Sequence, residues 1–179
     1  MRRSGWGDNH QGGTSDGAGY SLPEPYPHVE VTGPNQYYAR ILLEDTSGKV
    51  SEMTAVTQYS YHNFVFEQSD LRTLLHGIAI VEMNHLDLLS RTIKALGGDP
   101  RYRGYDGRYW NGDLVYYGSD IVDRITADIA AEKLAIQQYQ YHQSLIADPN
   151  IQNLLERIIK DELYHITLFQ KALNKYNNK

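Results

Sequence analysis

Two short motifs have the residue types and the spacing of metal ligands: Glu82-x-x-His85 and Glu162-x-x-His165. On an α-helix, residues three positions apart lie on one face about a turn apart, so the carboxylate and the imidazole of each motif can reach one ion. One such motif alone is weak, because this spacing arises often by chance and usually marks a solvated helix face. Here the flanking residues at helical spacing are apolar, which predicts that both motifs point into a core.

An internal repeat links the two motifs. A shift of 80 positions superimposes residues 52–96 on residues 132–176 without a gap, and 12 of 45 positions are identical. Glu52 and Glu132, each 30 positions before a motif, belong to the retained set. A core-only constraint gives no reason to keep Glu and His in step, so the repeat predicts two related helical hairpins that share a site. The predicted metal ligands are Glu52, Glu82, His85, Glu132, Glu162 and His165.

The charge of this set predicts what it binds. Four carboxylates in an apolar seam are costly alone, because a buried unpaired charge costs several kcal/mol. Two divalent cations balance four ionised glutamates and two neutral imidazoles. One Glu from each of two helices and a Glu-x-x-His from each of the others is the di-iron or di-manganese arrangement. The prediction is two manganese or iron ions per chain, with one ion specific to each histidine and with Glu52 and Glu132 as the shared carboxylates.

Two tyrosines accompany the glutamates. Tyr59 and Tyr139 lie seven residues after Glu52 and Glu132, so each is two turns along the same face and can hydrogen-bond a ligand carboxylate. The alternative is an ordinary pair of core tyrosines. We include both, with the four glutamates, among the candidate catalytic residues.

Other polar residues are assigned structural roles. His62 and His142 also repeat, but a spacing of ten positions from the glutamates turns them off the metal face. They are expected to make contacts at the hairpin ends or between subunits. Glu44 and Asp45 are expected on a solvated helix face.

The ligands need four helices to position them. Helical signals begin after Pro34, are interrupted near Gly48 and resume to about Glu67. A second helix is expected from a cap at Ser69 to a stop at Gly97, and a third opens at Ser119-Asp120. Asp148-Pro149 begins the fourth. Two tight hairpins joined by a long crossover predict an all-α, ferritin-like four-helix bundle over residues 34–179, preceded by an extended arm at 1–33.

Composition narrows the function classes. The chain has 179 residues, 41% hydrophobic content and a formal net charge of -5, which favours one domain and disfavours a nucleic-acid partner. It has no cysteine, so thiolate metal sites and a cysteine nucleophile are excluded. No apolar stretch is long enough to predict a membrane span. We expect a cytoplasmic protein.

The motifs also carry a family resemblance. The stretch Ser51-Glu-Met-Thr-Ala-Val-Thr-Gln-Tyr59, the Ile80-Val-Glu-Met-Asn-His85 and Asp161-Glu-Leu-Tyr-His165 motifs and Ala130-Ala-Glu132 resemble manganese catalases and related spore-coat proteins, and more distantly rubrerythrins and bacterioferritins. The similarity covers roughly residues 34–176. It implies a shared di-metal carboxylate site on the six residues named above, a homo-oligomer, hydrogen peroxide or dioxygen as substrate, and spore association as an alternative location. Without cysteine, this chain has no rubredoxin module.

Three functions compete at this stage. The first is dismutation of hydrogen peroxide by a redox-cycling metal pair, which needs no external electron donor. The second is iron oxidation, iron storage or peroxide reduction of the bacterioferritin and rubrerythrin type. The third is a spore-coat structural protein that retains the metal site for stability.

Overall fold

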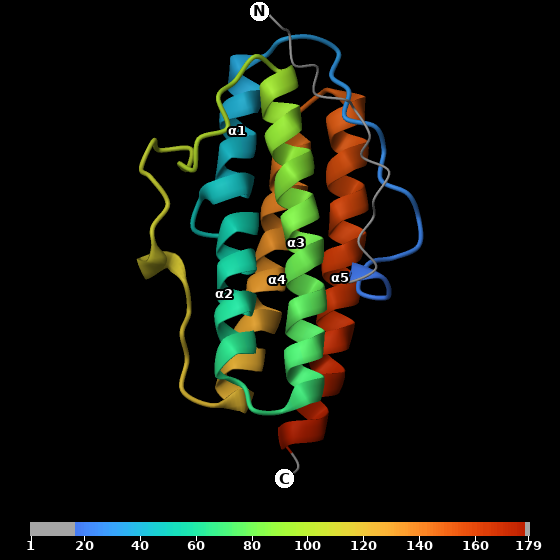
Figure 1. Cartoon of the computed structure of the whole chain (residues 1–179). Coiled ribbons are helices and arrows are strands. Elements are labelled where there is room, and N and C mark those ends of the chain that lie inside the picture. Colours follow the sequence, from blue (N-terminus) through green and yellow to red (C-terminus); the bar gives the residue numbers. More distant parts are fainter. Residues whose placement is uncertain (1–16, 178–179) are drawn as a thin grey trace, which may run out of the picture.

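A computed structural model describes residues 17–177 and shows an all-α, ferritin-like bundle of four long rods (Figure 1). One rod is broken into two helices, so the elements that the structure assigns in the described residues are five α-helices and a short 3₁₀ helix. They are α1 (Gln36–Ser47), α2 (Glu52–Val65), α3 (Ser69–Ala95), η2 (Gly112–Leu114), α4 (Ile121–Leu145) and α5 (Pro149–Asn177). Hairpin α2–α3 packs beside hairpin α4–α5, and the long crossover between α3 and α4 makes those two helices parallel.

The helix starts follow the local sequence signals. Asn35, Ser51 and Asp120 cap α1, α2 and α4 by accepting hydrogen bonds from backbone N–H groups of the first turn. Asp148 accepts from Asn150 N at 3.0 Å, just before Pro149 opens α5. The predicted cap at Ser69 is wrong: Ser69 is the first residue of α3, after Gln68, which makes no side-chain cap bond.

The predicted break near Gly48 is confirmed. A Cβ atom at Gly48 would lie 2.6 Å from the backbone oxygen of Glu44, too close for any other residue to fit without a shift. The backbone at Gly48 is extended, so the chain leaves α1 there and re-enters a helix after the Ser51 cap, which sets Glu52 at the very start of α2. This interruption fixes where along the bundle the first glutamate lies.

Two apolar clusters form the core. One cluster joins α1, α3, α4 and α5 around Leu42, Ile93 and Ile158, and the other joins α2, α3, α4 and α5 around Tyr59, Leu75 and Phe169. All of these side chains are buried.

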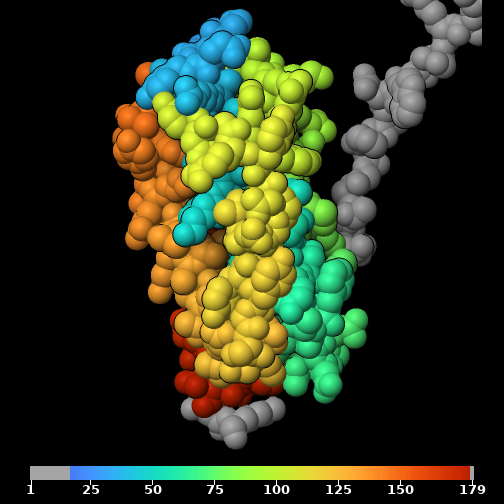
Figure 2. All heavy atoms as spheres, turned by 90° about the vertical axis from the view of Figure 1, so that its left-hand side faces the viewer, coloured from blue at the N-terminus to red at the C-terminus, as the bar shows by residue number. Residues whose placement is uncertain are grey.

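The crossover runs down the face formed by α2 and α4, as Figure 2 shows for the yellow segment. Trp110 Nε1 donates to Thr54 Oγ1 at 3.0 Å, and Arg124 Nε donates to the Tyr117 carbonyl at 2.9 Å. Several crossover rings remain substantially exposed, including Tyr109 at 63%. The crossover is thus anchored by polar contacts to α2 and α4, and also to α1, where Arg40 and Ser47 donate to the carbonyls of Tyr105 and Arg103.

The segment before α1 lies against another side of the bundle, along α5 and α3 (Figure 1). Arg157 on α5 donates to the carbonyls of Leu22 and Glu24, each at 2.9 Å. Tyr164 donates to the Gly19 carbonyl at 3.1 Å. Between residues 20 and 35 the backbone forms no helix, and residues 1–16 of the expected arm lie outside the described range.

No helix within residues 17–177 is both long and apolar enough to span a bilayer.

Candidate metal centre

The structure brings all six predicted ligand residues together in the middle of the bundle. Glu52 is the first residue of α2 and Glu132 lies midway along α4, while the two Glu-x-x-His motifs lie on α3 and α5. All six residues are at most 3% exposed. Their donor atoms form two overlapping groups in which all atoms lie within 4.8 Å of one another, the only such groups in the described part of the chain.

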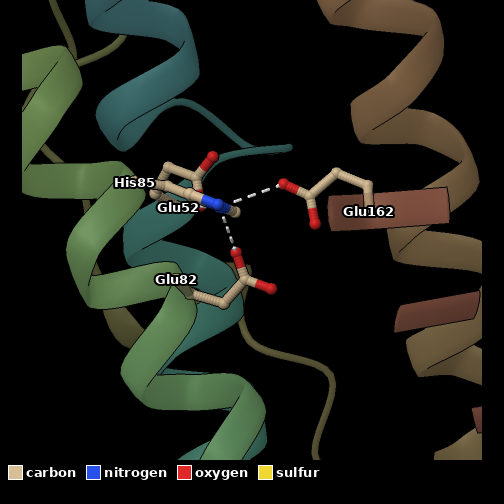
Figure 3. A group of neighbouring side chains, drawn as sticks. All are labelled: Glu52, Glu82, His85 and Glu162. Atoms are coloured by element: carbon tan, nitrogen blue, oxygen red, sulfur yellow. Dashed lines mark hydrogen bonds and ion pairs between the residues drawn. The ribbon is translucent and has the colours of Figure 1, made fainter. Parts of the chain in front are cut away.

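The first group surrounds His85 (Figure 3). Its Nδ1 lies 3.1 Å from Glu82 Oε2, 3.2 Å from Glu162 Oε1 and 3.7 Å from Glu52 Oε2. Three carboxylates from three helices therefore converge on one imidazole nitrogen, which is a donor set for one divalent ion.

The second group surrounds His165 in the same way. Its Nδ1 lies 2.9 Å from both Glu82 Oε1 and Glu162 Oε2, and 3.5 Å from Glu132 Oε1. Glu82 and Glu162 thus turn one oxygen toward each histidine. The sequence assigned the shared role to Glu52 and Glu132, but these two belong to one group each.

The tautomers of both histidines leave Nδ1 available for a metal. His165 Nε2 is 3.0 Å from the Tyr20 carbonyl, which can only accept, so Nε2 carries the hydrogen. His85 Nε2 lies 3.2 Å from Asp161 Oδ2. Although burial would raise it, hydrogen bonds from His85, Tyr26 and Arg157 hold the pKa of Asp161 well below its usual value, so Asp161 is an acceptor as well.

The electrostatics describe a centre that needs positive charge. Burial first, and then neighbouring carboxylates, raise the pKa of Glu52 and of Glu132 well above the ordinary value. Burial would lower the pKa of His85 and of His165, but the glutamates around them raise it well above normal. Without a metal, protons on these groups neutralise part of the negative charge of the four carboxylates. Divalent cations would displace these protons when they bind.

One buried carboxylate oxygen lacks, among the described residues, the hydrogen bond that it would need in the absence of a cation. Glu82 Oε1 is buried and accepts no hydrogen bond from any described residue, although His165 Nδ1 lies 2.9 Å away. Buried carboxylate oxygens are normally hydrogen-bonded or bound to a metal. The oxygen and nitrogen donors therefore fit two hard or borderline divalent ions such as manganese or iron.

The two tyrosines bond across the centre. Tyr59 donates to Glu132 Oε1 at 2.8 Å, and Tyr139 donates to Glu52 Oε1. Each phenol thus reaches the glutamate of the opposite hairpin, not the one on its own helix. Burial and nearby carboxylates raise the pKa of both tyrosines well above normal, so both hydroxyls stay protonated donors.

Beyond the centre, His62 is part of a buried polar cluster. Its Nδ1 lies 3.0 Å from Asp128, which also accepts from Gln58 Nε2 at 2.8 Å. His62 Nε2 donates to the Tyr116 carbonyl at 2.8 Å, and Gln58 Oε1 accepts from Tyr116 N at 2.9 Å. The cluster lies near the end of α2, as expected for His62, but within one chain, and it holds the crossover.

A matching cluster surrounds His142 near the end of α4. Its Nδ1 lies 2.8 Å from Asp45, and Gln138 Nε2 donates at 2.8 Å to both Asp45 Oδ1 and the Val50 carbonyl. Asp45 is fully buried, so its expected position on a solvated face is wrong. The repeated Gln and His were visible in the sequence, but the aspartates that join them are not in register with the repeat.

A cavity of about 240 Å³ opens beside the centre, between α2 and α4 under the crossover. Near the surface it is bordered by Leu134, which is 50% exposed, and by Tyr116, which is 46% exposed. Small side chains line much of the rest, so the cavity offers room for a small molecule beside the carboxylates. The lining includes Glu52, Glu82, Glu132, Glu162, Tyr59, Tyr139, Ala55, Ala127, Ala131 and Ala135.

Similar proteins were found at both the sequence and the structure level. A probable manganese catalase of Clostridium acetobutylicum is 26% identical over 171 residues, covering 84% of this chain and 76% of the relative. Protein CotJC of Bacillus subtilis is 25% identical over 175 residues, covering 86% of this chain and 92% of CotJC. The crystal structure of KatB, a manganese catalase from Anabaena, superimposes with a TM-score of 0.82 at 28% identity, covering 87% of this chain and 80% of KatB.

More distant structures share the fold. The bacterioferritin of Rhodobacter capsulatus superimposes with a TM-score of 0.69 at 21% identity, covering 82% of this chain and 89% of that one. At the sequence level, the family model for the ferritin-like domain matches residues 50–178, which include every candidate ligand. The chain therefore belongs to the ferritin-like domain family.

Proposed function

We propose that this protein is a di-metal oxidoreductase, with manganese or iron, that dismutates hydrogen peroxide. The observation that carries the proposal is the pair of overlapping Glu and His groups that share two carboxylates beside an accessible cavity. The relatives named as manganese catalases support the choice of substrate.

The reaction balances without a further reactant. One peroxide is reduced to two waters as its O–O bond breaks, and a second is oxidised to dioxygen, giving two waters and one dioxygen from two peroxides. A bound pair of manganese or iron ions supplies the two-electron redox change that links these halves. The chain has no cysteine to hold an iron–sulfur relay, which agrees with a reaction that needs no outside electron donor.

The residues of the chain would bind the metals, orient the ligands and leave room for peroxide. Glu82 and Glu162 would each contribute to both metal positions, because each turns one oxygen toward each histidine. Glu132 and Glu52, which each belong to one group only, are held in place by hydrogen bonds from Tyr59 and Tyr139. The cavity, which is lined in large part by small apolar side chains, has room for a molecule of the size of peroxide beside the carboxylates.

Oxygen evolution tests the proposal. Protein loaded with manganese should release dioxygen from hydrogen peroxide with no reductant added, and Glu82→Ala should abolish this while circular dichroism still shows a helical fold. A matched control is Glu156→Ala, an exposed position on α5. Protein with two bound manganese ions and no oxygen release would contradict dismutation.

The same ligands suit iron oxidation, so the alternative is tested in parallel. Rapid oxidation of Fe(II) by the iron-loaded protein, with no oxygen evolution from its manganese form, would favour the bacterioferritin-like activity. The bacterioferritin similarity alone supports the fold, not this activity.

A further inference from the structure

The segment before α1 reaches the metal centre from outside the bundle. The Tyr20 carbonyl accepts from His165 Nε2 at 3.0 Å, and the Tyr26 hydroxyl lies 3.1 Å from His85 Nε2. Because Nδ1 of each ring faces the carboxylates, Nε2 is the one nitrogen left to orient each imidazole. Both orienting contacts therefore include a residue of this segment.

Tyr26 is held in place by a buried network. Its hydroxyl donates to Asp161 Oδ2 at 2.5 Å, and Leu22 N donates to Asp161 Oδ1 at 2.8 Å. Arg157 Nη1 lies 2.7 Å from Asp161 Oδ1, and its guanidinium carbon lies 4.3 Å from the centre of the Tyr26 ring. Asp161 is 0% exposed, so the segment supplies two of the donors that this buried carboxylate needs.

The sequence repeat is interrupted where the segment crosses the helices. The shift of 80 positions pairs Gly77 with Arg157 and Val81 with Asp161. A Cβ atom at Gly77 would lie 2.2 Å from the Tyr20 ring, so α3 has no side chain where that ring packs. On α5 the equivalent positions provide the cation and the carboxylate that bind Leu22 and Tyr26. The two hairpins thus differ at positions that accommodate the segment.

We propose that residues 19–26, here called the arm segment, are an integral part of the metal centre, with Tyr26 as a positioning residue for His85 and the Tyr20 carbonyl as the orienting acceptor for His165. This inference rests on the two-metal centre proposed above. It makes the two metal positions unequal. His85 is backed by a carboxylate and a phenol, and His165 by a neutral carbonyl.

The two metal positions are expected to differ in affinity, and the contacts of the two histidines indicate which one binds more tightly. An imidazole whose outer N–H donates to a carboxylate is a more basic ligand than one that donates to a carbonyl, and loss of such a partner typically weakens metal affinity about 10- to 100-fold. The ion beside His85 is therefore held more tightly than the ion beside His165. The difference is expected as two separate phases when a chelator removes manganese from the wild-type protein.

Tyr26→Phe tests the role of the hydroxyl, since the ring over Arg157 is kept. We expect the slower of the two phases to accelerate by about 10- to 100-fold, with the faster phase unchanged and an altered electron paramagnetic resonance spectrum of the manganese pair. The matched control is Tyr38→Phe, which removes the hydroxyl that accepts from Ala147 N, away from the centre. It should leave both phases and the spectrum as in the wild type.

Gly77→Ala tests the other half. Alanine has a higher helix propensity than glycine. If the arm segment had no role at the metal centre, Gly77→Ala would therefore raise the thermal stability of the metal-free protein and leave metal release unchanged. We expect instead that displacement of Tyr20 accelerates the faster phase, which belongs to the ion beside His165.

The outcomes separate the two proposals. Two bound ions in the wild type, with Tyr26→Phe and Gly77→Ala releasing them at the rates of Tyr38→Phe, would overturn the role of the arm segment alone. A wild-type protein that binds no metal under saturating manganese would overturn the metal centre and this inference with it. Melting of the metal-free variants shows whether any change in release is a loss of folding.

Discussion

Among single residues, Glu82 and Glu162 have a position that the other two glutamates lack, because their two oxygens face different histidines. In the proposed centre, removing one of them would take a ligand from both ions, whereas removing Glu52 or Glu132 would take a ligand from one ion. The two groups therefore favour Glu82 and Glu162 as the shared carboxylates, where the sequence pattern favoured Glu52 and Glu132, and the two assignments can be told apart by measurement.

We expect Glu82→Gln to reduce bound manganese from about two ions per chain to below one, and Glu52→Gln to leave about one, because metal affinity depends on each deprotonated ligand of the site. Metal analysis after gel filtration measures both. Glu156→Gln, exposed on α5, should retain the wild-type content. Equal losses in the Glu82 and Glu52 variants would show that the two carboxylates have the same role.

Tyr139 is the second residue whose effect can be isolated. Its hydroxyl donates to Glu52, so Tyr139→Phe leaves that buried carboxylate with one donor fewer while preserving the ring. We expect about 10- to 100-fold weaker retention of one ion, as for other partners of metal ligands. Competition with a chromogenic chelator measures it. Tyr141→Phe is the control, since Tyr141 is 61% exposed, and retention equal in both variants would contradict the role of Tyr139.

Among the elements, the start of α3 and the end of α5 are joined by an exposed cluster. Asp70 Oδ2 accepts from Lys175 Nζ and Asp70 Oδ1 accepts from the Tyr176 hydroxyl, each at 2.7 Å. These hydrogen bonds lower the pKa of Asp70 from its ordinary value of 3.8 to about 2. A carboxyl whose folded pKa is depressed stabilises the protein above its unfolded pKa, and this contribution is lost as the pH falls through the folded pKa.

We therefore expect Asp70→Asn to lower the free energy of unfolding at pH 7 by about 0.2–1 kcal/mol, a small value because the pair is solvent-exposed. The difference from the wild type should shrink as the pH is lowered from about 4 toward about 2. Urea denaturation at several pH values measures it. Asp87→Asn, which removes a pair within α3 alone, is the control. A difference that grows on acidification would contradict the assignment.

The helices themselves were largely predictable because their signals are local. Gly48 interrupts the first rod, and Asp120 and Asp148 begin α4 and α5, as their side chains indicate. The six candidate ligands were found from spacing and repeat, since helical periodicity places i and i+3 on one face whatever the rest of the chain does. At Ser69 the local rule failed, because the turn between α2 and α3 places Gln68 at the cap.

Across the whole molecule, what could not be predicted depends on contacts between distant segments. Tyr26 is 135 positions from Asp161, and His142 is 97 positions from Asp45. Neither pair has a spacing that any single helix could show. The proline-rich sequence around Tyr26 predicted only an extended segment, and the sharing of carboxylates depends on how α3 and α5 are rotated about their axes.

The cavity is likewise a property of the assembled molecule, since α2, α4 and the crossover each provide part of its wall. The crossover is held over it by Gln58 and His62, which bind the Tyr116 backbone. If this cavity is the route to the metals, a larger side chain on its wall should slow the reaction without changing the centre. Ala131 on α4 is suited to this test because it lines the cavity, is not a candidate ligand and is half-buried.

We expect Ala131→Leu to reduce kcat/KM for hydrogen peroxide by about tenfold, equivalent to about 1.4 kcal/mol of transition-state stabilisation, with the bound metal unchanged. Leucine is a good helix former, so α4 should persist. Gln137→Leu, exposed on the same helix and outside the cavity lining, controls for added apolar surface. Initial rates of oxygen release over a range of peroxide concentrations give kcat/KM for each variant. An Ala131→Leu protein with two metal ions and wild-type kcat/KM would show that peroxide reaches the metals by another path, and the arm segment on the side of α3 and α5 would then be the place to look for it.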